Sequence, residues 1–358
     1  MADGVSIVVP TLDRPSLAGL LAALADAGPQ PWRLELLLVD DRPQQRDRLA
    51  VPARLAPLVR VLPGRAAGPA AARNRGWRAA RYEWVAFLDD DVVPAPDWLR
   101  RLADDLAVGP GVGGVQGRVV VPLPTVRAPT DWERHTAALA DAAWITADMA
   151  YRRAVLRAVG GFDERFGRAY REDAELAHRV RAAGWQLVRG RRRVSHPVRP
   201  AGRWVSLAAQ RGNADDALLR RMYGRRWREL LAVPVGRRGR HLAVTLAGLA
   251  AVGLGSAAGL VVDRPRGRVV TGVLAVACAI GWLAGTGEFA LARLRPGPRD
   301  RAEVGTMLLT STIIPPLALG HWLRGWLRYR GARPLRFATA RIGNHFPRAR
   351  QTVRRGPL

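Results

Sequence analysis

Short apolar runs alternate with stretches of helical periodicity through the first 100 residues of the chain. The runs end at prolines or acidic residues and cover residues 5–9, 34–39, 59–63 and 84–88. Four to eight apolar residues bounded by turn formers predict buried strands. Between them, leucines at helical spacing predict a helix that Ser16 can cap, and the Gly68-Pro69 turn opens an alanine-rich helix. Strands alternating with helices predict an α/β fold, with a mostly parallel sheet covered by helices on both faces.

Acidic residues follow the ends of three predicted strands: Asp13, Asp40 and Asp41, and then Asp89, Asp90 and Asp91. Ligands bind beyond the carboxyl ends of parallel strands, so we expect these acids to converge on one edge of the sheet. Three consecutive carboxylates repel one another, and a divalent cation such as Mg²⁺ would relieve that repulsion. The alternative is an acidic start to the helix expected near Pro96, although a helix cap needs only one acid.

The charge of the chain does not indicate a nucleic-acid partner. The formal net charge is +27, and all 57 basic residues are arginine, which suggests a compositional bias. These arginines are spread along the chain, whereas a nucleic-acid surface needs clustered basic and aromatic residues. The single cysteine, Cys278, excludes an internal disulfide and a cysteine-based metal site. The first residues lead directly into a predicted strand, so we expect no signal peptide.

The C-terminal third is different in character. Residues 242–262 and 269–287 are uncharged apolar stretches of membrane-spanning length, and residues 304–323 form a third that contains Pro315 and Pro316. We expect a membrane region of two to three helices over residues 241–323, followed by an arginine-rich tail over residues 324–358. The soluble alternative is a buried helical hairpin.

Several motifs occur in an order that resembles family 2 glycosyltransferases. The nucleotide-sugar half of that family is matched by residues 8–11, 39–41, 68–76 and 87–91. The acceptor half is matched by residues 115–117, 146–153, 160–166, 171–176 and 195–197. The resemblance implies a GT-A fold over residues 1–236, divided into a nucleotide-sugar half (1–118) and an acceptor half (119–236).

The resemblance assigns a metal site to the acidic strand end. Asp89 and Asp91 form an Asp-x-Asp motif that would hold Mg²⁺ or Mn²⁺ against the nucleotide diphosphate. A Lewis acid there stabilises the charge that develops on the leaving diphosphate. His196 would complete the metal shell or touch the diphosphate; the alternative is a structural histidine.

The remaining donor-side residues are implied by the same motifs. Asp41 and Asp40 would meet the base or ribose of the nucleotide, with plain turn chemistry as the alternative. The other members of this nucleotide pocket are Pro10, Thr11, Asp13, Arg73, Asn74, Asp89 and Asp90.

Glu172 and Asp173 match the catalytic carboxylate pair of the family, with Asp173 as general base. An acceptor hydroxyl is a poor nucleophile until a carboxylate takes its proton. One direct displacement would invert the anomeric centre. The alternative is a solvated helix start, where acids interact favourably with the helix dipole.

Departures from the family pattern bear on specificity. Asp13 and Asp148 stand where many relatives carry asparagine, which would change sugar or acceptor choice because an ionised acid cannot donate a hydrogen bond. The Gln-x-x-Arg-Trp motif of processive synthases lacks its glutamine at residues 223–227, so we predict transfer of a single sugar. Core packing is the preferred interpretation for three tryptophans that could line a sugar site, namely Trp98, Trp144 and Trp185.

Together these features predict a membrane-anchored, metal-dependent, inverting hexosyltransferase. It would move one sugar from a UDP-, GDP- or dTDP-linked donor to a lipid-linked or cell-envelope glycan. The alternatives are a catalytically inactive membrane scaffold of the same fold, a sugar nucleotidyltransferase, which would need a glycine-rich loop after the first strand, and a nucleic-acid binder, ranked last.

The same interpretation predicts a multi-pass protein of the cell membrane whose catalytic domain is cytoplasmic, because nucleotide sugars are cytosolic. Three spans would place the tail outside. That tail has ten arginines and no acid, a composition that favours the cytoplasmic side. Two spans with a re-entrant or interfacial third segment would keep it inside, and we favour that arrangement.

Overall fold

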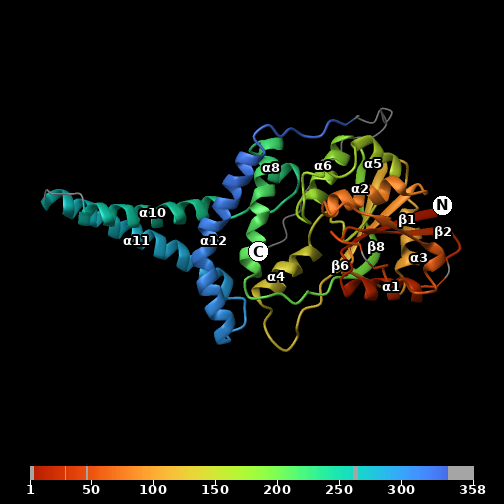
Figure 1. Ribbon diagram of the computed structural model, residues 1–358, viewed down its shortest axis with the longest axis horizontal. Helices are drawn as coiled ribbons and strands as arrows, with labels where there is room; N and C mark the ends of the chain where they lie inside the picture. Colours follow the sequence, from red (N-terminus) through yellow and green to blue (C-terminus); the bar gives the residue numbers. More distant parts are fainter. Residues whose placement is uncertain (1–3, 29, 46, 261–264, 338–358) are drawn as a thin grey trace.

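The fold is known from a computed structural model, which describes residues 4–28, 30–45, 47–260 and 265–337. A mixed eight-stranded sheet forms its centre, in the order β3-β2-β1-β4-β7-β6-β8-β5 (Figure 1). The strands are β1 (Gly4–Thr11), β2 (Arg33–Asp40), β3 (Val59–Pro63), β4 (Trp84–Leu88), β5 (Val93–Pro94), β6 (Val112–Val120), β7 (Asp148–Arg152) and β8 (Gln186–Ser195).

Helices cover both faces of this sheet (Figure 1). Those of the first 236 residues are α1 (Ser16–Asp26), α2 (Pro69–Ala79), α3 (Trp98–Leu106), α4 (Asp131–Ala137), α5 (Arg153–Val159), α6 (Glu172–Ala182), α7 (Val205–Ala209), α8 (Asn213–Tyr223) and α9 (Trp227–Leu230). Short 3₁₀ turns lie at Ala56–Leu58, Ala138–Ala140 and Gln210–Gly212. The predicted α/β class is therefore confirmed.

The four strands predicted from apolar runs pair as a parallel sheet, in the order β3-β2-β1-β4. Beyond β4 the pairing changes: β7 is antiparallel to both β4 and β6, and β8 is parallel to β6. The sheet is thus mixed, and its parallel part is the predicted one. The strands β4 and β8 consequently run in the same direction, which brings their carboxyl ends to the same edge.

Burial on both faces explains why the strand sequences are continuously apolar. One core cluster packs Ile7 and Leu36 against the leucines of α1, and the other packs Val8 and Phe87 against α2 and α5. The predicted cap of α1 is wrong, because Pro15 occupies the N-cap position and the Ser16 hydroxyl has no partner among the described residues.

A buried arginine joins β6, β7 and β8 to α3. The guanidinium of Arg192 on β8 donates to Asp148 Oδ1 at 2.7 Å, to Asp105 Oδ2 at 3.1 Å and to the Val115 carbonyl at 2.7 Å. Asp148 also accepts from Trp98 Nε1 at 2.9 Å. Asp148 is fully buried in this network, so it is part of the interior instead of a residue that faces sugar or acceptor.

The last three helices are α10 (Arg238–Leu260), α11 (Pro265–Leu294) and α12 (Arg301–Arg328). All three are long and apolar enough to cross a membrane. The hairpin of α10 and α11 projects from the α/β domain (Figure 1), and many of its apolar side chains are exposed. A buried soluble hairpin is therefore not what the structure shows. Residues 261–264 of the connecting loop and residues 338–358 of the predicted tail lie outside the described residues.

Replacement of Arg192 tests the buried network. Arg192→Met leaves two buried carboxylates without their cation, so we expect the free energy of unfolding of the catalytic domain to fall by about 3 to 5 kcal/mol. Arg193→Met, at an exposed position on the same strand, serves as the matched control and should change it by less than about 0.5 kcal/mol. Urea titration of the full chain in detergent measures both. Equal effects would show that the network does not stabilise the fold.

Candidate active site

The predicted acids do converge on one edge of the sheet. The residues at or just beyond the ends of β1, β2, β4 and β8 are linked there by hydrogen bonds and ion pairs, and the first turn of α6 joins them through Arg73. The shared direction of these strands accounts for this arrangement.

Asp90 holds the segment after β1 against the segment after β4. Its carboxylate accepts from Thr11 Oγ1 at 2.8 Å, from the Leu12 amide at 3.4 Å and from Arg14 Nη1 at 3.2 Å. Asp90 is buried, so its observed contacts are those of a structural clamp. Pro10 lies half-buried within β1, just before this clamp.

Three further acids line the same edge near the end of β2. Arg42 pairs with both Asp13 and Asp40 at 2.7 Å. Asp41 accepts from the backbone amides of Arg65 at 3.1 Å and Gly68 at 2.9 Å. Asp40 also accepts from the Arg42 amide at 3.2 Å, which fits the turn-chemistry interpretation, whereas the contacts of Asp41 are with a distant segment and do not. A role of either acid with a nucleotide remains a prediction.

Arg73 joins the predicted metal motif to the predicted catalytic helix. This α2 side chain is 1% exposed. Its Nη2 donates to Asp89 Oδ1 at 2.6 Å, and its Nη1 donates to Glu172 Oε1 at 2.8 Å. One guanidinium therefore fixes the distance between the end of β4 and the start of α6.

Asn74 anchors the glycine-aromatic segment that precedes α6. Its side-chain amide donates to the Phe162 carbonyl at 2.9 Å and to Glu164 Oε1 at 2.8 Å, and its oxygen accepts from the Phe162 amide at 2.9 Å. An added Cβ at Gly161 would lie 2.4 Å from that same oxygen, which explains the glycine. Arg73 and Asn74 thus hold the approach to α6 from two consecutive positions.

The chain turns sharply at Arg171 to present two acids in the first turn of α6. Arg171 has a left-handed backbone with φ of 75°. Glu172 is buried and Asp173 is half-buried, so Asp173 is the more accessible of the two. Burial, and then repulsion from Asp173, raise the pKa of Glu172 to about 7 against the opposing effect of Arg73. Burial also raises the pKa of Asp173, toward the range in which a carboxylate is an effective general base.

Asp91 has three charged or titratable neighbours: the carboxylate of Asp89, the imidazole of His196 and the guanidinium of Arg199. His196 Nε2 lies 3.5 Å from Asp91 Oδ1, and Arg199 Nε lies 3.0 Å from Asp91 Oδ2. Burial raises the pKa of Asp91, and Asp89 adds to this increase, while His196 and Arg199 oppose it. His196 Nδ1 is buried without a hydrogen-bond partner among the described residues.

These residues fit a divalent cation in their chemistry. Carboxylate oxygens and an imidazole nitrogen are ligands that Mn²⁺ and, for the oxygens, Mg²⁺ accept. Burial is the main cause of the raised pKa of Asp91, and a bound cation would favour the ionised form of this carboxyl. Within the described ranges, no group of three or more His, Cys, Asp or Glu side chains is already gathered as a metal site. The predicted set Asp89, Asp91 and His196 therefore remains a prediction.

Arg199 is one of three arginines at this site that sequence reasoning missed, together with Arg14 and Arg42. It follows His196 by three residues and its side chain is 47% exposed, although its guanidinium reaches Asp91. In a chain with 57 arginines, one more arginine in a loop carries no distinctive signal. Of the three tryptophans, Trp98 lies in the core, and Trp144 and Trp185 pack against the second core cluster.

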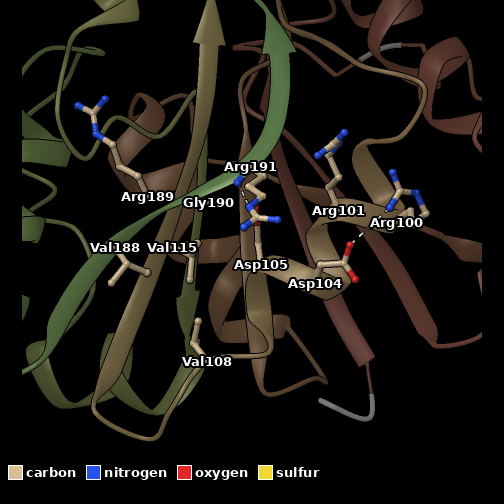
Figure 2. Close-up of a pocket in the computed structure, with 10 residues that line it drawn as sticks. All are labelled: Arg100, Arg101, Asp104, Asp105, Val108, Val115, Val188, Arg189, Gly190 and Arg191. Atoms are coloured by element: carbon tan, nitrogen blue, oxygen red, sulfur yellow. Dashed lines mark hydrogen bonds and ion pairs between the residues drawn. The ribbon is translucent and has the colours of Figure 1, made fainter.

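A separate cavity of about 500 Å³ lies between the end of α3 and the middle of β8 (Figure 2). Arginines from α3 and β8 are among its lining residues, and on α3 Arg100 pairs with Asp104 at 3.6 Å, one helical turn away. Asp105 at its base is already paired with Arg192. The predicted site residues do not line this cavity, so we assign the candidate site to the acidic edge.

The mixed sheet with helices on both faces agrees with the predicted GT-A fold. Residues 6–173 match the family described as Glycosyl transferase family 2. The predicted resemblance is confirmed, and the chain carries a family 2 glycosyltransferase domain followed by three apolar helices.

The chain is similar to several named proteins over part of their length. It is 34% identical over 133 residues to the pre-mycofactocin glycosyltransferase of Mycobacterium tuberculosis, covering 34% of this chain and 28% of that protein. It is 28% identical over 248 residues to the O-antigen biosynthesis protein RfbC of Myxococcus xanthus, covering 58% of this chain and 19% of that protein. The chain thus spans under a third of the length of these relatives.

Among solved structures, the chain resembles the mannosyltransferase PcManGT from Pyrobaculum calidifontis, in complex with GDP-Man and Mn²⁺. The two share 17% identity, with coverage of 90% of this chain and 87% of the other, and the TM-score is 0.44.

Replacement of Arg73 tests the bridge at the site. Because burial raises the pKa of Glu172 to about 7, its contribution to the free energy of unfolding falls as pH rises from about 4.5 to about 7. Arg73 lowers the pKa of Glu172, so this pKa should rise further in Arg73→Met. The loss of unfolding free energy should therefore be larger at pH 8 than at pH 5.5, and at pH 8 it should be about 3 kcal/mol or more.

Arg75→Met, exposed on the same helix, is the control and should be nearly neutral at both pH values. Urea titrations at pH 5.5 and pH 8 give the comparison. If the loss of unfolding free energy in Arg73→Met is the same at both pH values, the pKa of Glu172 does not depend on Arg73.

Proposed function

We propose that this protein is a metal-dependent, inverting glycosyltransferase that moves one hexose from a nucleotide-sugar donor to a glycan acceptor at a membrane. The observation that carries the proposal is the Arg73 bridge, which ties the Asp-x-Asp acid Asp89 to the helix that presents Asp173. Donor and acceptor chemistry would thereby share one edge of the sheet.

On the donor side, Asp89 and Asp91 would hold a divalent cation, with His196 adjoining Asp91. When bound, the cation supplies Lewis-acid stabilisation of the leaving diphosphate. Arg199 lies beside Asp91 and would bring a second positive charge close to the leaving diphosphate. Asp40 and Asp41, at and just after the end of β2, would meet the base or ribose of a UDP, GDP or dTDP sugar.

On the acceptor side, Asp173 would take the proton of the attacking hydroxyl. The acceptor oxygen then forms its bond to the anomeric carbon as the bond from that carbon to the diphosphate breaks. The electron pair of the broken bond leaves with the diphosphate, and the configuration at the anomeric carbon inverts. Glu172, held by Arg73 and buried, positions the first turn of α6.

The proposed acceptor class is supported by the anchor and by the names of the relatives. The apolar hairpin would fix the catalytic domain at a membrane, with the domain on the cytoplasmic side where nucleotide sugars occur. Relatives of this chain are named for O-antigen, succinoglycan and chondroitin synthesis, which supports an acceptor among lipid-linked or cell-envelope glycans. The incomplete processivity motif at residues 223–227 favours a single transfer.

Replacement of Asp173 tests the proposed base. Asp173→Asn keeps the shape of the side chain and removes its basicity, so transfer should fall by about 100-fold or more while donor affinity is unchanged. Asp104→Asn, an exposed acid on α3 with side-chain exposure of 68%, is the control and should retain activity. Release of nucleoside diphosphate in the presence of membrane glycan extract measures transfer. Wild-type turnover in Asp173→Asn would place the base elsewhere.

A further inference from the structure

The helix α12 has the length and composition of a third membrane span, but both of its ends contact the catalytic domain. Near its start, Glu303 Oε1 accepts from the Asp131 amide of α4 at 3.0 Å. Near its end, Trp326 accepts through its carbonyl from Arg221 of α8 at 3.0 Å. A helix of this length that crossed a bilayer would have its ends on opposite sides of about 30 Å of hydrocarbon. One domain on one side could not contact both ends.

Close packing fixes the C-terminal half of α12 on α8. At Gly325, an added Cβ would lie 2.5 Å from the Ala214 carbonyl oxygen, so only glycine allows this approach. The chain beyond α12 then returns to the catalytic domain: Arg165 donates to the Arg333 carbonyl at 2.9 Å, and Phe337 packs against the second core cluster.

A buried polar joint fixes the N-terminal half. Arg293, at the end of α11, donates to Thr310 Oγ1 at 2.8 Å and Ser311 Oγ at 3.0 Å on α12, and to Asp131 Oδ2 at 2.8 Å on α4. Its side chain is only 8% exposed. The joint therefore ties the base of the hairpin, α12 and the acceptor half of the catalytic domain at one point.

The opposite face of α12 is apolar and exposed. Its exposed large side chains recur at helical spacing and are Leu308, Leu309, Ile313, Leu323 and Leu327. In Figure 1, α12 stands across the base of the α10–α11 hairpin, between the hairpin and the catalytic domain. Arginines lie at both ends of the helix, at Arg301, Arg324 and Arg328. An apolar stripe with flanking basic residues, in the plane from which a membrane hairpin rises, is the pattern of an interfacial helix.

We propose that α12 lies flat on the surface of an anionic bilayer, with its leucine stripe in the boundary between headgroups and acyl chains. Only α10 and α11 cross the membrane. The segment from the start of α12 to residue 337 stays on the same side as the catalytic domain. This topology does not depend on the reaction that the acidic edge performs, so its test needs no activity measurement.

Cysteine labelling in sealed membrane vesicles tests the topology. In a Cys278→Ala background, Gly331→Cys reports the chain after α12, Gly109→Cys reports the catalytic domain, and Arg266→Cys reports the tip of the hairpin. An added Cβ meets no atom within 4 Å at Gly331 or Gly109, so neither change disturbs packing. An impermeant maleimide should label Gly331→Cys and Gly109→Cys from the same side and Arg266→Cys from the other. Labelling of Gly331→Cys together with Arg266→Cys would overturn the proposal.

Spin labels at Leu309→Cys and Leu323→Cys measure the tilt of α12 independently. The two positions are about 21 Å apart along a helix. If the helix lies in the membrane surface, both labels are at the same shallow depth. The two positions should then have the same accessibility to oxygen as each other, and the same accessibility to a water-soluble nickel complex. Depths that differ by most of that distance would show a span, and two labels inaccessible to oxygen would show that a second protein copy covers the stripe instead of lipid.

Discussion

The buried guanidinium of Arg73 is the contact on which the arrangement of the site depends. An α/β sheet brings strand ends together, but the sheet itself does not offset the repulsion between carboxylates that meet there. Arg73 does this for Asp89 and Glu172 from a position that is 1% exposed. Arginine suits the task because its planar fork donates in two directions and stays protonated when buried. Lysine would supply one point charge, which cannot fix two carboxylates at a set separation.

The same solution recurs across the domain. Asp91 is compensated by Arg199, Asp90 by Arg14, and Asp148 by Arg192. Arg293 then joins the membrane-proximal helices to α4. A chain without lysine thus uses arginine for structure at its interior and for charge at its surface. This is why the net charge is a poor guide to function here, whereas the partner of each buried arginine is informative.

Local sequence patterns predicted the parallel half of the fold well, because its strands are buried on both faces and end in turn formers. The runs at 59–63 and 84–88 coincide with β3 and β4. The insertion of β7 and the burial of Asp148 were not predictable, since they depend on pairing between segments far apart in the chain. The acids of the site could be predicted from the strand ends. The bridge from Arg73 to Asp89 and Glu172, and the contact of Arg199 with Asp91, are visible only in the folded structure. For α12, the sequence analysis favoured a re-entrant or interfacial segment over a third span but could not separate these two, because residues such as Met307 and Ile314 are apolar whether they pack on protein or lipid.

The central claim is that the acidic edge binds a nucleotide sugar through a divalent cation. Calorimetric titration of the detergent-purified full chain with UDP, GDP and dTDP sugars, with Mn²⁺ and with a chelator, tests it most directly. We expect one nucleotide class to bind only when Mn²⁺ is present, and we expect Asp91→Ala to abolish this binding. A folded protein that binds none of these donors, or binds one equally well with the chelator, would contradict it.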